Sequence, residues 1–209
     1  MPPKALYAKG ITRRKILIDA AASLLAERPI ETISLHHIAK KARIPPGSAY
    51  HFFANAQEVF MALAERFGQE LIEAIIAPYP PNHTNSWQQL YGAAVDRGVD
   101  IYRQTPAYCI LILGPNSPPT LKFSDRKNDV EIGKLFTQIL ELHFDLPDLP
   151  NLPEKVFYSI EIVDLLLSLS FIYHQTLKHE MIEEGKLAAI AYLKHYLPDT
   201  LPHRIPKLD

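Results

Sequence analysis

The sequence predicts an all-α protein with an N-terminal three-helix head, a C-terminal helical bundle and about nine helices. Two observations lead to this prediction. Apolar residues recur at helical spacing through most segments, whereas the alternation typical of half-buried strands does not appear. Proline clusters near 78–81, 115–119, 147–153 and 198–206 separate the later segments. We therefore expect helices joined by short loops, with no internal repeat.

Composition and charge restrict the class of protein. A length of 209 residues, with 47% hydrophobic and 22% charged residues, suits one large or two small globular domains. The net charge of −1 argues against a general polyanion binder. The charge is unevenly distributed, however, because residues 1–56 hold nine Lys/Arg and three Asp/Glu. A basic head on an acidic body indicates that one end faces phosphate; chance clustering is the alternative.

Cys109 is the single cysteine, so an internal disulfide is excluded, which fits a reducing cytosol. It lies in an apolar run, and we expect it to be a packed core residue rather than a redox sensor. Neither a signal segment nor an apolar run long enough to span a membrane is expected. The sequence therefore predicts a cytoplasmic protein without a membrane partner.

The chain is expected to begin with a short basic arm up to Gly10, followed by a first helix from about Thr12. The core face of this helix is expected to comprise Ile16, Leu17, Ala20, Ala21, Leu24 and Leu25. Thr12 is the expected N-cap, and the cations that follow it, Arg14 among them, oppose the helix dipole. Such cations are tolerable where phosphates lie alongside; the alternative is a merely solvated basic end.

The stretch Ser34–Phe53 reads as two short helices joined by a tight turn, which is the plan of a helix-turn-helix. Ser34 is a suitable N-cap. The expected buried stripe of the first helix comprises Leu35, Ile38, Ala39 and Ala42. Pro45 and Pro46 interrupt that helix and suit the first turn of a second, expected over 46–52. Small, hydroxyl and imidazole side chains on the second helix suit a DNA major groove.

Three motifs occur in order along this part of the chain: TRRKILIDAA at 12–21, SLHHIA at 34–39 and GSAYHFF at 47–53. In this order and spacing they resemble the DNA-binding domain of the tetracycline-repressor (TetR/AcrR) family of bacterial regulators, over roughly the first third of the chain. The resemblance implies a DNA-binding domain at 11–71, with its helix-turn-helix at 34–53, and a ligand-binding and dimerisation domain at 78–197. The DNA contacts that it implies are Thr12, Arg14, Ser34, His36, Arg43, Pro46, Gly47, Ser48, Tyr50 and His51.

The sequence departs from the family pattern at three places. Arg43 stands where the family has a turn glycine with positive φ, so strain is expected there. Pro45-Pro46 replaces the usual polar pair, and Ala56 lies where a basic residue often follows the last phenylalanine of the motif. DNA binding remains the best interpretation, while the bases that are read stay open.

The remaining helices follow from periodicity and proline positions. Asn55 is an expected N-cap, with Glu58 three residues later, for a long helix that reaches about Ala77. In the family this helix links the head to the body. Further helices are expected near 86–104, 106–113, 124–143, 153–179 and 182–196, with a loop at 115–122 and an extended tail after Leu197.

The segment Ile160–Tyr173 is apolar on almost every side, so it needs cover on every side. A partner subunit is a reasonable second cover in a chain of this size. In the family the last two long helices pair with their copies in a four-helix interface. A homodimer is therefore expected.

The C-terminal part is rich in aromatic residues, which at helical spacing are more often core than pocket. The resemblance nevertheless implies a small-molecule site there, and apolar pockets with a few polar groups are the usual design. The expected lining residues are Tyr91, Tyr102, Tyr108, Phe136, Glu161, Asp164 and His174, and the expected effector is apolar or aromatic. Glu161 and Asp164 share a helix face. They suit an acid pair in an enzyme, ligand contacts or a core network.

Catalytic motifs are not visible: we find no Gly-rich phosphate loop, nucleophile elbow or paired catalytic carboxylates. The pairs His36–His37 and His174–His179 have poor spacing for a shared metal. No enzyme activity, metal or cofactor is expected. The sequence thus predicts a ligand-responsive DNA-binding regulator, a repressor released from a near-palindromic operator by a small molecule. The alternative is a small-molecule-binding or enzymatic helical bundle whose helix-turn-helix does not bind DNA.

Overall fold

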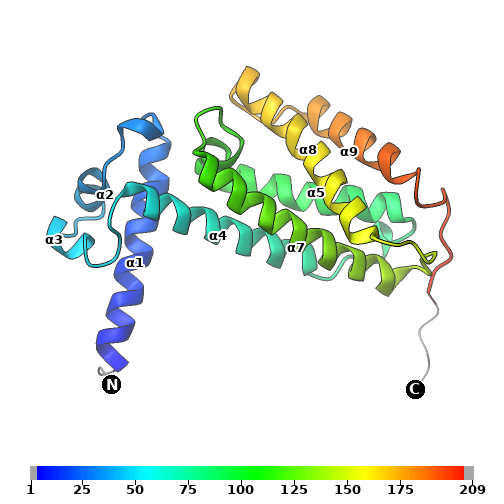
Figure 1. Ribbon diagram of the computed structural model, residues 1–209, viewed down its shortest axis with the longest axis horizontal. Helices are drawn as coiled ribbons and strands as arrows, with labels where there is room; N and C mark the ends of the chain where they lie inside the picture. Colours follow the sequence, from blue (N-terminus) through cyan, green and yellow to red (C-terminus); the bar gives the residue numbers. More distant parts are fainter. Residues whose placement is uncertain (1–3, 205–209) are drawn as a thin grey trace. The chain divides into compact units, whose positions relative to one another are not determined.

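The computed structural model describes residues 4–204, with side chains from Gly10 onward. Within this range all regular elements are helical (Figure 1). The β-pairing within the same range is one isolated bridge between Phe144 and His203. The predicted all-α class with about nine helices is confirmed. The elements are α1 (Lys4–Leu25), η1 (Ile30–Thr32), α2 (Leu35–Lys41), α3 (Pro46–Ala49), α4 (Ala56–Ile76), η2 (Pro81–His83), α5 (Trp87–Gln104), α6 (Pro106–Tyr108), η3 (Cys109–Leu113), α7 (Pro119–His143), α8 (Leu152–His174) and α9 (His179–Leu193).

The chain forms two compact units. The first contains residues up to 67 together with 105–124, and the second contains 68–104 together with 125–209. The segment 105–124 therefore packs with the N-terminal helices, although it lies far from them in the sequence. The long helix α4 and helix α7 each contribute residues to both units.

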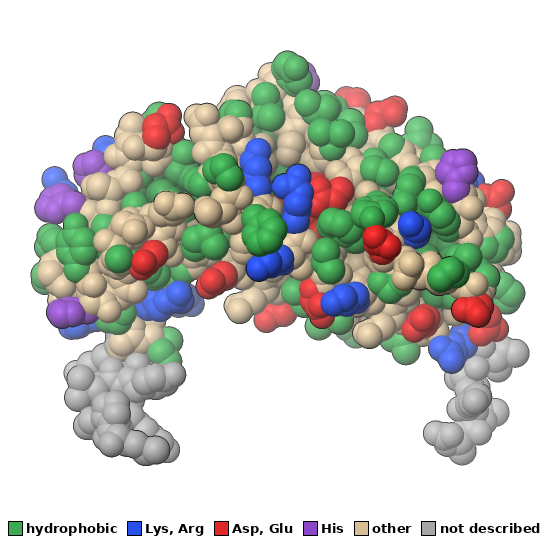
Figure 2. Space-filling view, viewed as in Figure 1, with side chains coloured by type: hydrophobic (Ala, Val, Ile, Leu, Met, Phe, Trp, Pro, Cys, Tyr) green, Lys and Arg blue, Asp and Glu red, His purple; other side chains and the backbone are tan. Residues whose placement is uncertain are grey.

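The core of the first unit is built from the apolar faces of α1, α2 and α4. Its buried side chains include Leu17, Leu25, Leu35, Ile38, Ala39, Phe53, Leu63 and Phe67. The predicted core face of α1 is confirmed except at Ile16, which is 40% exposed. Lys, Arg and His side chains gather on the surface around α2 and α3 in Figure 2.

Arg66 of α4 connects three segments of the first unit. Its guanidinium pairs with Asp19 of α1 and donates from Nε to the hydroxyl of Tyr108 in α6, at 3.2 Å. Tyr108 is fully buried, and its ring centroid lies 4.9 Å from that of Phe67. A buried hydroxyl needs a partner, and a charged donor supplies a strong one. Arg66 and Phe67 thus anchor the segment 105–124 to α1 and α4.

In the second unit, α8 and α9 pack closely because α9 carries small residues at the contact. A Cβ at Gly185 would lie 3.5 Å from Leu166 Cβ and from Val163 Cα, and Ala189 is fully buried. The hydroxyl of Tyr91 on α5 donates to Ser159 of α8 at 2.9 Å. This bond fixes α5 against α8 inside the core.

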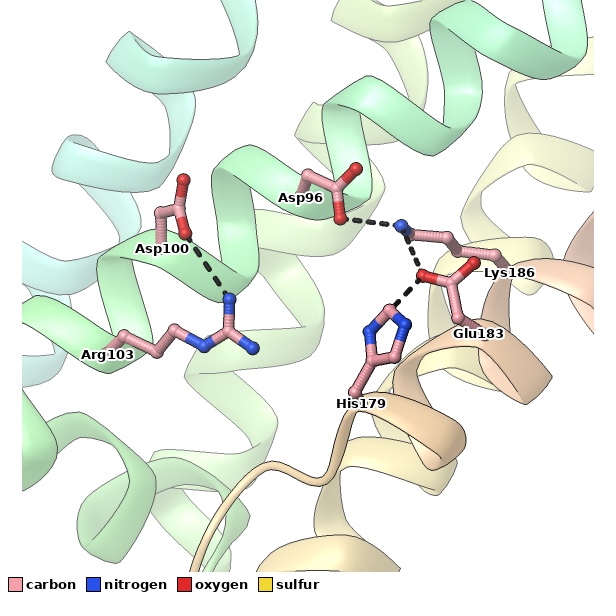
Figure 3. A network of polar contacts seen from close by, with 6 residues as sticks. All are labelled: Asp96, Asp100, Arg103, His179, Glu183 and Lys186. Atoms are coloured by element: carbon pink, nitrogen blue, oxygen red, sulfur yellow. Dashed lines mark hydrogen bonds and ion pairs between the residues drawn. The ribbon is translucent and has the colours of Figure 1, made fainter.

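Polar contacts also hold α5 against its neighbours. Lys186 of α9 donates to Asp96 of α5 at 2.6 Å and to Glu183 at 2.8 Å, with its side chain only 13% exposed (Figure 3). Arg97 of α5 donates to the carbonyls of Ala74, Ala77 and Pro78. These contacts satisfy carbonyls at the C-terminal end of α4, where a cation is favoured.

The structure differs from the sequence predictions at several helix boundaries and in the tail. Helix α1 begins at Lys4, so Thr12 lies inside the helix and is not its N-cap; the first three residues of the expected arm lie outside the described residues. Helix α7 begins at Pro119, so the loop expected at 115–122 is shorter, because proline suits the first turn of a helix. The tail also turns back, with Asp145 N–H donating to Pro202 O at 2.8 Å.

Helix α8 ends at His174 rather than near His179. Gln175 adopts a left-handed conformation with φ 56°, which stops the helix. The hydroxyl of Ser170 then donates to Thr176 O at 2.9 Å and accepts from Lys178 N–H at 2.8 Å. These bonds hold the short connection to α9.

By length and composition alone, α8 is apolar enough to span a membrane, with a mean hydropathy of 1.7. The expectation that no such run exists is therefore wrong. Only 33% of its most apolar 18-residue window is buried. The helix pairs with α9, and Glu161 and Asp164 interrupt its apolar surface.

Helix α2 ends in a Schellman motif. Ile44 N–H donates to Ala39 O at 2.9 Å, and Arg43 N–H donates to Lys40 O at 3.2 Å. Arg43 has φ 56°, so the strain predicted at this position is present. Ile44 is buried beside fully buried Ala39, which supplies the apolar contact of the motif.

We expect Arg43→Gly to raise the free energy of unfolding by about 0.5–1 kcal/mol. Relief of left-handed strain, about 1–2 kcal/mol, exceeds the entropic cost of glycine, about 0.5–1 kcal/mol. Urea unfolding followed by circular dichroism measures the change. The control Lys40→Gly, at a helical position, should instead lower stability by about 0.5–1 kcal/mol. A less stable Arg43→Gly protein would contradict the expectation.

Candidate nucleic-acid interface

The helix-turn-helix begins with a capping box at the start of α2. Ser34 Oγ accepts from His37 N–H, and His37 Nδ1 accepts from Ser34 N–H, both at 3.2 Å. Two orphan amide groups are thereby satisfied. His36, the adjacent residue, remains exposed. The predicted cap is confirmed, with histidine in the place where Glu or Gln usually stands.

Helix α3 is a single α-turn with Pro46 at its first position, followed by a hydrogen-bonded turn to Phe53. The helix predicted over 46–52 is therefore shorter than expected. Ala49, fully buried, and Phe53, 4% exposed, anchor it to the core. Gly47, Tyr50 and His51 are left exposed, with Tyr50 at 58%.

Gly47 faces open space. A Cβ built at this position meets no atom within 4 Å, and its φ is not positive. Neither packing nor backbone conformation within the chain therefore requires glycine here. A position of this kind on an exposed helix start permits the close approach of a bulky partner.

The next cap positions the long helix α4. Asn55 Oδ1 accepts from Glu58 N–H at 3.0 Å, and Glu58 Oε2 accepts from Ala54 N–H at 2.7 Å. The predicted variant capping box is thus formed. Arg14 of α1 lies over the Phe53 ring, 5.1 Å from its centroid. An exposed cation is in this way placed beside α3.

The structure places all ten predicted DNA contacts in the first unit. Nine are exposed, and Ser48 is partly buried. Exposed amide, hydroxyl, imidazole and guanidinium groups of this kind suit phosphates and base edges.

The predicted ligand contacts are divided between the units. Tyr108 belongs to the first unit and hydrogen-bonds to Arg66, whereas the other six belong to the second. Tyr91, Tyr102 and Phe136 are core residues, with the rings of Tyr91 and Phe136 edge-to-face at 5.7 Å. His174 is exposed at the end of α8. None of the seven lines either of two surface clefts described in the second unit, one of about 500 Å³ beside Asp96 and Lys186 and one of about 460 Å³ beside Phe144.

Glu161 and Asp164 of α8 meet two carboxylates of α7 that the sequence did not single out. Asp125, Asp129 and Asp164 each place one carboxylate oxygen within 4.8 Å of the others. Arg126 Nε lies 3.3 Å from Glu161 Oε2. Asp125 and Asp129 are four residues apart on one helix, a spacing that places both on one face and was available from the sequence.

Burial and like charge shift the protonation of this cluster. Burial, followed by the charge of Glu161, raises the pKa of Asp125 to about 7, while Arg126 opposes the shift. Burial raises the pKa of Asp129 well above its ordinary value, with Asp164 adding the largest charge effect. Burial and then Asp125 raise the pKa of Asp164 in the same direction. These carboxyl groups resist ionising together.

Two family models match the chain. Residues 17–63 match "Bacterial regulatory proteins, tetR family", and residues 85–197 match "Tetracyclin repressor-like, C-terminal domain". No curated protein matches the sequence. The second match alone covers more than half of the chain.

Solved structures share the fold. A TetR-family regulator from Streptomyces coelicolor is 22% identical with a TM-score of 0.68, covering 88% of this chain and 98% of that one. SmeT, the repressor of the Stenotrophomonas maltophilia multidrug efflux pump SmeDEF, is 16% identical with a TM-score of 0.64, covering 92% and 97%. The fatty acid degradation regulator FadR from Bacillus halodurans is 15% identical with a TM-score of 0.61, covering 92% and 97%. The chain belongs to the TetR family of DNA-binding transcriptional regulators, which are not enzymes.

Proposed function

We propose that the chain is a cytoplasmic homodimeric repressor that binds a near-palindromic operator through α3 and is released by a small molecule. One observation carries the proposal: α3 is anchored by Ala49 and Phe53 and exposes Gly47, Tyr50 and His51. In the DNA complex, His51 and Ser48 read base edges. Tyr50 and Arg14 contact phosphates.

The homodimer forms through α8 and α9. Tyr158, Leu165 and Ile172 are 39%, 57% and 38% exposed and follow one another at intervals of seven residues. Seven residues are close to two helical turns, so these side chains form one stripe along α8. Leu187 of α9 is 63% exposed. A second copy would remove this apolar surface from water.

Release follows from a population shift within the dimer. The segment 105–124 belongs to the first unit and is anchored there by Arg66, but it continues directly from α5 and into α7. An effector that favours another arrangement of α5 and α7 therefore acts on the head through the chain itself. The recognition helices would then miss successive major grooves, which lie about 34–36 Å apart.

The effector is proposed to be an apolar or aromatic molecule bound among the second-unit helices. Tyr91, Tyr102 and Phe136 supply its apolar contacts, and Glu161 and Asp164 supply polar ones. Because the aromatic residues are packed as core, the bound state requires the core to open. The relatives that repress an efflux pump or regulate fatty acid degradation support an effector of apolar character.

Selection from a random duplex pool tests the whole proposal. The ligand-free protein should enrich a sequence with two-fold symmetry, because the operator mirrors the symmetry of the dimer. Pools without any enriched symmetric motif would contradict the repressor function and favour a helical bundle that does not bind DNA.

We expect Gly47→Ala to weaken operator binding by about 10- to 100-fold without loss of stability. The methyl group meets nothing in the protein, but it would separate the start of α3 from DNA. One lost hydrogen bond to a charged group costs about 1.5–3 kcal/mol. Fluorescence anisotropy measures binding. Gly92→Ala, another open position but on α5, is the matched control and should bind normally. Full affinity in Gly47→Ala would show that DNA does not approach there.

We expect Tyr50→Phe to weaken binding to all duplexes by about 0.5–1.5 kcal/mol, because one hydroxyl-to-phosphate bond is lost while the ring remains. The ratio of specific to non-specific affinity should stay constant. Tyr173→Phe removes an exposed hydroxyl from α8 and serves as the control, since Tyr173 is 75% exposed. A change of base preference in Tyr50→Phe would assign Tyr50 to base reading instead.

We expect Leu165→Glu to convert the dimer to monomers in sedimentation at micromolar concentration, because it places a charge in the α8 stripe. The control Leu142→Glu changes a 71% exposed leucine on α7 and should leave the dimer intact. A wild-type protein that sediments as a monomer at this concentration would rule out the proposed dimer.

A further inference from the structure

The carboxylate cluster of α7 and α8 has the geometry of a cation site. One oxygen from each of Asp125, Asp129 and Asp164 lies within 4.8 Å of the others. Two oxygens bound to the same Mg²⁺, Mn²⁺ or Ca²⁺ ion lie at most two bond lengths apart, which is about 4–5 Å. These separations are close to those that the coordination shell of one ion between α7 and α8 spans.

An independent observation points into the same cluster. Asp129 is only 3% exposed, and its Oδ2 has no hydrogen-bond partner among the described residues. Glu161 Oε1 is also buried without a partner, although Glu161 Oε2 pairs with Arg126. An unpaired buried carboxylate oxygen is costly, and such groups normally coordinate a metal or meet a counter-charge. The cluster thus lacks a positive partner at Asp129.

The charge around the cluster is not balanced by the guanidinium that faces it. Four negatively charged carboxylates repel one another here: those of Asp125, Asp129, Glu161 and Asp164. Arg126 is the cation that offsets this repulsion. Arg126 is already bonded to Glu161. A divalent ion would offset the remaining repulsion.

We propose that Asp125, Asp129 and Asp164 bind one divalent metal ion of the oxygen-preferring class, Mg²⁺, Mn²⁺ or Ca²⁺. The site is all-oxygen, which suits these hard cations rather than Zn²⁺ or Cu²⁺. Asp125 and Asp164 are partly exposed, so an ion can enter and water can complete its shell. The ion joins α7 to α8 within the second unit. The proposal does not rest on operator binding; it shares Asp164 with the proposed effector site, so the metal is tested on the ligand-free protein.

Mn²⁺ is the probe for the test. Full-length protein is treated with a chelator and desalted, and MnCl₂ is then titrated while electron paramagnetic resonance follows the free ion. We expect about one Mn²⁺ per chain, displaced by excess Mg²⁺ or Ca²⁺. Thermal unfolding should shift upward by roughly 5–10 °C at about 100 times Kd, because the ion binds only the folded state.

Asp129→Asn and Asp164→Asn should each weaken Mn²⁺ binding at least tenfold and abolish the thermal shift. Their unfolding temperature without metal should equal or exceed that of wild type, because a repelling charge is removed. Asp125→Asn, at the more accessible ligand, provides the same test if a deeper variant does not fold. Glu131→Gln removes an exposed carboxylate from α7 and should bind Mn²⁺ normally.

Three results would overturn the proposal. The first is that the protein binds no Mn²⁺ below about 1 mM. The second is that the Asp→Asn variants bind Mn²⁺ as wild type does. The third is that spermidine or guanidinium shifts thermal unfolding whereas no metal does. The last result would assign the cluster to an organic cation.

Discussion

The two bonds of Arg66 are the constraint on which the first unit depends. One guanidinium joins Asp19 of α1 and the hydroxyl of Tyr108, so α1, α4 and α6 are fixed at a single point. The half-exposed ion pair contributes little stability by itself. Arg66 matters because it gives the buried Tyr108 hydroxyl a charged hydrogen-bond donor and so fixes the position of that side chain. The segment that arrives from α5 and leaves through α7 is thereby held in the unit that contains α3.

The second unit handles charge in two contrasting ways. Lys186 is nearly buried but meets two carboxylates, Asp96 and Glu183, so its charge is compensated where α5 meets α9. The contact between α7 and α8 instead gathers like charges, and burial raises the pKa of Asp125, Asp129 and Asp164. Packing therefore holds α7 and α8 together, while repulsion among the carboxylates opposes their contact. Positive charge, whether from protons or from a cation, would relieve this repulsion.

Local rules predicted much of the fold and part of the site. Periodicity identified the helices, and the caps at Ser34 and Asn55 and the left-handed Arg43 followed from residue type and position. Features that depend on contacts longer than one helical turn could not be predicted from the sequence. Helix α8 ends where it does because the Ser170 hydroxyl donates to Thr176 O, past the left-handed Gln175. The carboxylate cluster depends on the register between α7 and α8. Spacing along one helix cannot supply that register, so Glu161 and Asp164 were found without Asp125 and Asp129.

Two positions of the helix-turn-helix depart from local preference in opposite directions. Arg43 occupies a left-handed position that costs a non-glycine residue about 1–2 kcal/mol. Gly47 occupies a helical position with room for a methyl group, where glycine is up to about 1 kcal/mol less favourable than alanine. Exchanging the two residue types would suit the isolated chain better. The proposed DNA complex would account for both, because a duplex favours a cation near phosphate at Arg43 and a close backbone approach at Gly47. The stability that the head gives up at these positions is thus consistent with selection for binding rather than for folding.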